Sequence, residues 1–497
     1  MDNNSLFERL SCKIESLLTQ CRLPFFSALV CGLLAHGYAF TNKLLNADET
    51  AALFSKGADV TSGRFGLVLS SYLFPDMSMP WIYGLISILL LSVAAFVTVR
   101  IFKIESPLLQ AVTAASITVF PAQTGTFCFM YTSSAYALAV LLSVLAVYFG
   151  EKGGKARFAL AFLSLGLSLL IYQAYISLTA SFFVILLIQK LLDKDSSAAD
   201  ALKGAVKYVV ILLAALGLYL LVTTLVKRIG GTGYQEYETF AEDGILSRVR
   251  VAYTSFVRVF VSGYFGFVNS KLSLAAHILC GAAGIVAVFA AIRSERDGKK
   301  TALLFALLFV FPLAVNCLYL IASVNIIHSV SQFGFVSVYV LAAVAADRLR
   351  GKLLRNKDIV IVSLSLVVLG NIFFANEVYL KMHLAYENAY AFYNTLMTQI
   401  METPGFSEYT VIDLVGNESR GVYSFDKIDT KGLVGPNRNL VDIYTRENFI
   451  YHYMGLKLYL YREDVIWADW FYEMPTYPDP GSIVLRPEEG RIVVKLS

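Results

Sequence analysis

Long apolar runs separated by short polar connections occupy the chain from residue 25 to residue 375. Most runs approach the length with which a helix crosses a hydrocarbon core of ~30 Å. Several are shorter than the ~20 residues of a perpendicular span, which is common for helices buried in protein or broken around a cavity. The pattern predicts an α-helical polytopic membrane protein with about eleven transmembrane helices. The runs are 25–40, 81–99, 108–121, 127–149, 158–172, 175–188, 208–226, 272–292, 302–322, 330–346 and 359–375.

Lysine and arginine are unevenly distributed among the connections, and this distribution predicts the orientation of the chain. With eleven spans, every basic connection lies on one side of the membrane and every connection without Lys or Arg lies on the other. Merging runs 158–172 and 175–188 into one helix would break this alternation. We therefore predict a cytoplasmic N-terminus and a C-terminus on the opposite side. The basic connections are 100–103, 152–157, 190–207, 293–300 and 348–357, and the neutral ones are 123–126, 173–174 and 323–329.

The same pattern divides the chain into three parts. Residues 1–24 are predicted to form a cytoplasmic amphipathic segment, and residues 25–375 a transmembrane bundle with external loops at 41–80 and 227–271. Residues 376–497 are predicted to lie outside the cytoplasm. A long helix at 376–402 would project from the last span and lead into a small α/β domain with strands at 410–415, 482–485 and 491–496. This last part contains no cysteine after residue 404, so it needs no disulfide.

Composition narrows the class of protein further. Only 16% of residues are charged, against roughly 25% in soluble domains. The sequence contains no phosphate-binding loop, no cluster with zinc-ligand spacing and no Gly-x-Ser-x-Gly motif, which excludes a nucleotide-driven pump. No nucleic acid is expected as a partner. The two histidines inside apolar runs, His36 and His277, are expected to serve packing.

The first external loop carries the strongest candidate for chemistry, the adjacent acids Asp48 and Glu49. Asn46 or Asp48 can cap a short helix that begins here, and the two carboxylates would then face the mouth of the bundle. A carboxylate at this place suits a catalytic base. An acidic first helical turn without a chemical role explains the pair equally well. A third possibility is that the pair holds a divalent metal such as Mg²⁺ or Mn²⁺.

Arginines in the external loops are candidates for binding a phosphate. Arg64 stands in Gly63-Arg64-Phe65-Gly66, where the glycines allow close approach to an anion and the guanidinium suits phosphate. Arg258, in the second external loop, is a further candidate. The alternative for both is an arginine that extends into solvent without a ligand.

Polar residues at two outer turns complete the candidate site. Tyr172, Gln173 and Tyr175 lie at one turn, and His328 and Gln332 at another. Both turns are predicted at the same external level as Asp48, Glu49 and Arg64. Irregular backbone at membrane depth usually lines a cavity, so these side chains are expected to contact substrate.

This layout resembles the GtrII-type glucosyltransferases, membrane enzymes linked to O-antigen glucosylation and similar in plan to the GT-C class. The features that carry the resemblance are Asp48-Glu49, Gly63-Arg64-Phe65, the stretch from Leu169 to Tyr175 that reads LLIYQAY, and the external helix leading into Val411-Ile412-Asp413-Leu414.

The resemblance implies a reaction. The donor would be a sugar on a polyprenyl phosphate such as undecaprenyl phosphate, and glucose follows from the family. The acceptor would be a lipid-linked glycan of the O-antigen type, so that the product modifies lipopolysaccharide. Catalysis would occur at the outer face of the bacterial inner membrane, with a periplasmic C-terminal domain. The catalytic acid of the family would fall on Asp48 or Glu49.

Three other functions were weighed against this one. A polyprenyl-linked sugar flippase or transporter usually carries ionisable residues at the bilayer midplane and internal repeats, and neither is evident here. A membrane acyltransferase would need a catalytic histidine, and His328 has no acidic or basic neighbour in sequence. A non-catalytic assembly protein would use the C-terminal part as a binding module.

Overall fold

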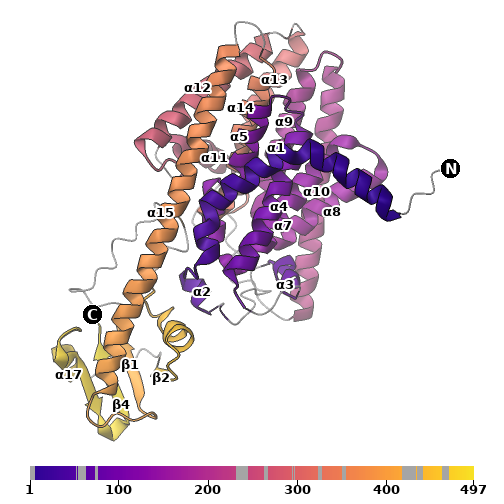
Figure 1. Cartoon of the computed structure of the whole chain (residues 1–497). Helices are drawn as coiled ribbons and strands as arrows, with labels where there is room; N and C mark the ends of the chain where they lie inside the picture. The colour runs from indigo at the N-terminus through magenta and orange to yellow at the C-terminus, as the bar shows by residue number, and fades with distance from the viewer. Residues whose placement is uncertain are drawn as a thin grey trace.

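The computed structural model describes residues 6–51, 53, 63–72, 77–230, 244–261, 267–293, 295, 297–322, 327–349, 354–416, 433, 440–461 and 469–496, with side chains from residue 22 onward. Each of the eleven apolar runs lies on a helix of one elongated bundle (Figure 1). The helices are α1 (Leu6–Thr41), α4 (Pro80–Ile101), α5 (Pro107–Thr118), α7 (Met130–Lys152), α8 (Lys155–Ile171), α9 (Ile176–Leu191), α10 (Ala198–Gly230), α12 (Lys271–Arg293), α13 (Gly298–Val315), α14 (Val336–Asp347) and α15 (Leu354–Met401).

Nine helices among the described residues are long and apolar enough to cross a membrane, where α9 and α14 are counted together with the 3₁₀ segments that precede them, as Gln173–Leu191 and Ser329–Asp347. The other two, α5 and α8, have 12 and 17 residues. Helix α5 ends early because Phe120 precedes a proline and is extended (ψ 138°), which restarts the chain as a separate short helix, α6 (Pro121–Phe127). The protein is therefore a helical membrane protein in which two of the helices are short.

Runs 158–172 and 175–188 form two separate helices, as predicted. Tyr172 is extended (φ −153°, ψ 112°) at the end of α8, and the 3₁₀ turn η3 (Gln173–Tyr175) leads into α9. At the other end of α8, Gly153 and Gly154 both have positive φ (71° and 92°) and form the turn from α7.

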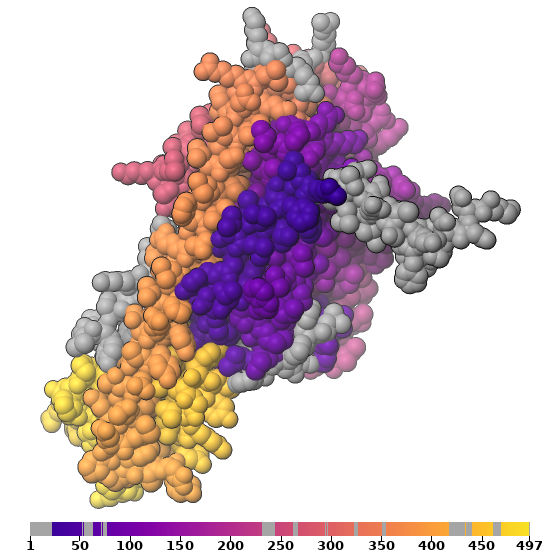
Figure 2. Space-filling model, viewed as in Figure 1, coloured from indigo at the N-terminus to yellow at the C-terminus, as the bar shows by residue number. Residues whose placement is uncertain are grey.

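The core of the bundle is built from small and aromatic side chains. Helix α4 packs between α1 and α7, and α12 packs against α15. Helix α15 also lies along α1 (Figure 2). The two histidines inside the apolar runs are enclosed. His36 bonds to the Tyr379 hydroxyl (2.7 Å), and His277 bonds to the Tyr339 hydroxyl (2.7 Å), so both serve packing as expected.

The basic connections meet at one end of the bundle. Arg348 donates to the carbonyls of Gln189 (3.4 Å) and Leu192 (3.3 Å), and Lys300 donates to the Asp193 carbonyl (2.9 Å). A cavity at this end is lined by Glu151, which lies beside the connection at 152–157, and by residues of the connections at 100–103, 190–207 and 348–357. The positive charges of all five connections therefore share one end.

The acidic loop lies at the opposite end. Helix α4 connects the two ends, because Ser78 just before it contacts the acidic loop while the Phe102 carbonyl just after it accepts from Gln189 (2.8 Å). The 22 residues of α4 separate them by about 33 Å. The short helices α2 (Ala47–Ala51) and α3 (Phe65–Ser71) lie at this second end (Figure 1). Helix α6 lies there too, because the Asn46 side chain before α2 bonds to the Cys128 carbonyl just after α6. We call this end the α2 end.

Helix α15, with 48 residues, continues beyond the bundle and carries the C-terminal region (residues 402–497) at the α2 end. A four-stranded sheet in the order β2-β1-β4-β3 packs against it. The predicted strands are present, and a further one is β2. The strands are β1 (Val411–Val415), β2 (Tyr459–Tyr461), β3 (Ile483–Arg486) and β4 (Arg491–Lys495). Strand β1 runs parallel to β2 and β4, and β3 runs antiparallel to β4. This region has its own core, formed by side chains of α15 with Ile412, Ile492 and Val494.

Candidate active site

The short helix α2 presents the two acids, and Asn46 fixes its start. The Asn46 side-chain oxygen accepts from the backbone N–H of Glu49 (2.9 Å), which is the bond expected of an N-cap residue. The Asn46 amide donates to the Cys128 carbonyl between α6 and α7. A single buried asparagine therefore both caps the helix and attaches it to the bundle.

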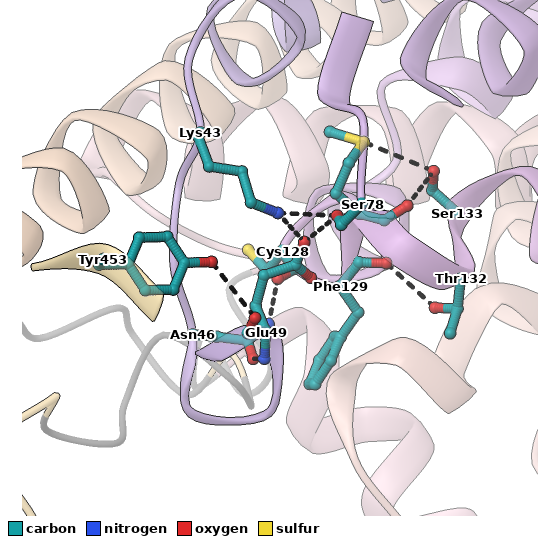
Figure 3. Close-up of polar contacts among 10 residues, drawn as sticks. Lys43, Asn46, Glu49, Ser78, Cys128, Phe129, Thr132, Ser133 and Tyr453 are labelled. Carbon is teal, nitrogen blue, oxygen red and sulfur yellow. Dashed lines mark hydrogen bonds and ion pairs between the residues drawn. The ribbon is translucent and has the colours of Figure 1, made fainter. Parts of the chain in front are cut away.

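Glu49 is fully buried, and its carboxylate is neutralised inside the protein. Its Oε1 atom accepts from the Lys43 ammonium and from the Ser78 hydroxyl, and Lys43 also donates to Ser78 (2.7 Å) (Figure 3). Its second oxygen, Oε2, is buried and has no hydrogen-bond partner among the described residues. Taking a carboxylate out of water is costly unless a cation accompanies it, which explains the lysine.

Asp48 has different surroundings. It is half-buried, and its Oδ1 atom accepts from the hydroxyl of Tyr444 in the C-terminal region (3.1 Å). The expectation that both carboxylates face the mouth of the bundle is therefore wrong for Glu49. Asp48 points outward from the first turn of α2 and stays accessible, whereas Glu49 is turned toward Lys43.

A divalent metal does not fit this pair. The Lys43 ammonium already bonds to the Oε1 atom of Glu49, and Asp48 has a separate partner in Tyr444. Nowhere in the described part of the chain do three His, Cys, Asp or Glu side chains form a group that could hold a metal ion. We therefore derive no step through a metal.

Arg64 immediately precedes α3, at its N-cap position. Its Nη1 atom donates to the Tyr136 hydroxyl (3.1 Å), and its guanidinium lies 5.3 Å from the centre of the Tyr172 ring. Gly63 adopts a positive φ of 67°, and its carbonyl accepts from Gln173 (3.3 Å), which also donates to the Tyr219 hydroxyl (2.9 Å). The structure thus brings together three of the residues predicted to bind substrate, Arg64, Tyr172 and Gln173.

Tyrosines form the wall behind Arg64. The rings of Tyr136 and Tyr172 stack with centroids 4.6 Å apart, and Tyr175 meets Tyr172 edge-on at 5.3 Å. The Tyr175 ring in turn meets the Phe333 ring of the 3₁₀ segment η7 (Ser329–Phe335), with the ring centroids 6.1 Å apart. A half-buried guanidinium held by aromatic faces is fixed in position while it keeps its charge.

Two of the neutral turns predicted on one side of the membrane lie in α6 and η3, and both elements pack against η7. The third turn, 323–329, leads into η7, and its residues 323–326 lie outside the described part of the chain. Gln332 is buried in η7, and its Nε2 atom has no partner among the described residues. His328 is exposed at the start of the same segment. Gln332 therefore offers an unused donor inside this group of turns, while His328 stands at its rim.

Tyr131 connects the acids with the arginine. Its hydroxyl lies within electrostatic range of Asp48, Glu49 and Arg64. The acidic turn and the guanidinium therefore both lie around this tyrosine, at the α2 end of the bundle.

The sequence model of the glucosyl transferase GtrII family matches residues 37–346. The chain belongs to the glucosyl transferase GtrII family. The matched stretch begins near the end of α1 and ends within α14, so it includes every residue of the site described above except Tyr444. A comparison with curated proteins finds no match. The protein is thus a membrane glucosyltransferase.

Arg258 lies elsewhere in this glucosyltransferase. It is exposed on α11 (Ile245–Val261), a helix that packs mainly on η5 (Cys317–Leu320) and α13. The described contacts do not bring it to Arg64, and its role in binding phosphate stays a prediction.

Five side chains of the site were not predicted from the sequence: Lys43, Ser78, Tyr131, Tyr136 and Tyr444. Lys43 had a signal, since it is a cation six positions before Glu49 in the same loop. Tyr136 lies within an apolar run, and Tyr444 lies 396 positions from Asp48, so neither could be paired with its partner from spacing.

Gly66→Ala is expected to loosen the attachment of α3 in this family member. A Cβ at this position would lie 2.8 Å from the Leu170 carbonyl carbon and 2.9 Å from the Ile171 nitrogen, both backbone atoms of α8. Overpacking of this kind costs about 1–3 kcal/mol, so the melting temperature of the purified protein should fall. The control is Gly37→Ala on α1, where a Cβ meets no atom within 4 Å. Equal melting temperatures for the two variants would contradict the prediction.

Proposed function

We propose that this glucosyltransferase transfers a glucosyl residue from a polyprenyl-phosphate-linked donor to a lipid-linked glycan of the O-antigen type at the outer face of the bacterial cytoplasmic membrane. The observation that supports this most strongly is the position of Arg64. A half-buried guanidinium, oriented by Tyr136 and Tyr172, lies in the same site as an accessible carboxylate. A phosphate leaving group and a sugar hydroxyl need these two groups together.

The carboxylate that suits the base is Asp48. The acceptor must reach the base, and Asp48 is half-buried whereas Glu49 is fully enclosed. The Oε1 atom of Glu49 is also occupied by the ion pair with Lys43. We assign to Glu49 the role of holding α2 and Lys43 in place.

The proposed reaction is a single displacement. The acceptor hydroxyl oxygen forms a bond to the anomeric carbon as the bond from this carbon to the phosphate oxygen breaks. The hydroxyl proton passes to Asp48, and the electron pair leaves with the prenyl phosphate. Direct attack inverts the configuration at the anomeric carbon. Arg64 stabilises the charge that develops on the phosphate, which is the electrostatic contribution expected of a preorganised cation.

Tyr172, Gln173 and Tyr175 are proposed to line the donor side of this site together with Gln332 and His328. Gln173 fixes the Gly63 carbonyl and thereby the backbone that presents Arg64. The Nε2 atom of Gln332 could donate to a sugar hydroxyl. The prenyl chain would extend between the outer halves of the helices.

The proposed topology has eleven spans, a cytoplasmic N-terminus and a periplasmic C-terminal region. The clustering of all basic connections at one end of the bundle supports it, because basic connections remain on the cytoplasmic side. The α2 end would then open to the periplasm.

The test is a transfer assay with the full chain in proteoliposomes. The donor is prenyl-phosphoglucose labelled in the glucose, and the acceptor is a lipid-linked oligosaccharide. We expect labelled glucose on the acceptor and release of prenyl phosphate. A flippase would move intact donor across the bilayer without releasing prenyl phosphate. That result, with no labelled acceptor, would contradict the proposed function.

A further inference from the structure

The C-terminal region, which the family match does not reach, is joined to the bundle at the acidic turn. Leu45, just before α2, is buried in the core of the C-terminal region with Phe449 and Ile450. In the opposite direction, Leu433 of the C-terminal region is buried in the core of the bundle, near Gly125 of α6. The exchange of one leucine in each direction fixes the two parts against each other.

Two tyrosines of the C-terminal region extend from this joint toward the acids. The first is Tyr453 in the π-helix η9 (Phe449–Tyr453), whose hydroxyl donates to the backbone carbonyl of Glu49 (3.4 Å) (Figure 3). Burial and the nearby Glu49 raise the pKa of Tyr453, so this hydroxyl remains a donor at neutral pH. Tyr453 therefore attaches the backbone of α2 to the C-terminal region.

The second tyrosine, Tyr444, reaches the proposed base itself. Its hydroxyl donates to the Oδ1 atom of Asp48 (3.1 Å). Its backbone is fixed by Asp442, whose Oδ1 atom accepts from the N–H groups of Tyr444 (2.9 Å) and Thr445 (3.0 Å). The ring is 49% exposed, so a substrate can lie beside the same carboxylate.

We propose that Tyr444 is a positioning residue that orients the Asp48 carboxylate toward the acceptor hydroxyl. By donating to Oδ1, it leaves Oδ2 to receive the proton. The C-terminal region is then a working part of the catalytic site, and its docking sets the geometry of the base. This inference rests on the proposed function, in which Asp48 is the base.

The test is Tyr444→Phe, which removes only the hydroxyl, assayed as the full chain in proteoliposomes with prenyl-phosphoglucose. We expect kcat to fall roughly 10-fold to 100-fold, which is the order of loss that follows from misplacing a catalytic group. The KM for the donor and the melting temperature should stay at wild-type values, because Arg64 and the joint are untouched. The matched control is Tyr451→Phe, a tyrosine of the same region with 52% exposure, and its kcat should equal that of the wild type.

A second measurement does not depend on activity. With p-benzoylphenylalanine in place of Tyr444, irradiation should crosslink the C-terminal region to the peptide that contains Asp48. The same substitution at Tyr472, which is 70% exposed on α17 (Asp469–Glu473), should not. Absence of this crosslink, or a wild-type kcat in Tyr444→Phe, would overturn the inference alone. An active site that fails to transfer glucose even in the wild type would overturn the proposed function, and the inference with it.

Discussion

Asp48→Asn is expected to lower kcat for glucosyl transfer by about 10²–10⁴-fold, the usual contribution of a positioned acid–base group. The asparagine amide has nearly the same shape and can still accept from Tyr444, but it cannot take a proton from the acceptor hydroxyl. The protein should insert, purify and melt as the wild type does. The measurement is the rate of transfer from prenyl-phosphoglucose under saturating donor and acceptor.

Two further variants make the assignment of the base decisive. Asp469→Asn, on the exposed start of α17 (Asp469–Glu473), removes a carboxylate of the C-terminal region far from α2 and should retain wild-type kcat. Glu49→Gln breaks the ion pair with Lys43 and should lower the melting temperature. If Glu49→Gln abolished transfer at an unchanged melting temperature while Asp48→Asn remained active, the roles of the two acids would be exchanged.

Arg64→Ala is expected to weaken donor binding about 10-fold to 100-fold. Hydrogen bonds to charged groups contribute about 1.5–3 kcal/mol, and 1.4 kcal/mol corresponds to tenfold in affinity. The same change also removes the contacts of the guanidinium with Tyr136 and Tyr172. The measurements are KM for prenyl-phosphoglucose and the affinity for prenyl phosphate in detergent.

Arg64→Lys separates charge from shape. Lysine keeps the positive charge but loses the planar group that stacks on Tyr172, so an intermediate affinity is expected. Arg157→Ala, which removes an exposed arginine from the basic end of the bundle, controls for the loss of one positive charge. Donor affinity equal to that of the wild type in Arg64→Ala would remove Arg64 from the phosphate site.

Much of the candidate site could be predicted because its residues lie at turns between apolar runs. Arg64, Tyr172 and Gln173 were expected at one level outside the spans, and the structure brings them into contact. Their positions next to the ends of the apolar runs predicted this common level. The distinction between Asp48 and Glu49 was beyond reach, because adjacent residues on a short helix point in directions that depend on what surrounds the helix.

The sequence by itself determined the helical membrane architecture, the position of each apolar helix, the separation of α8 from α9 and three of the four strands. These follow from hydrophobic length, periodicity and the placement of charges, which are local properties of the chain. Only the tertiary structure decided that Lys43 and Ser78 enclose Glu49, that Tyr136 holds Arg64, and that Tyr444 reaches Asp48. Such contacts join positions up to 396 residues apart, and they arise from the docking of one packed unit on another, which no local pattern encodes.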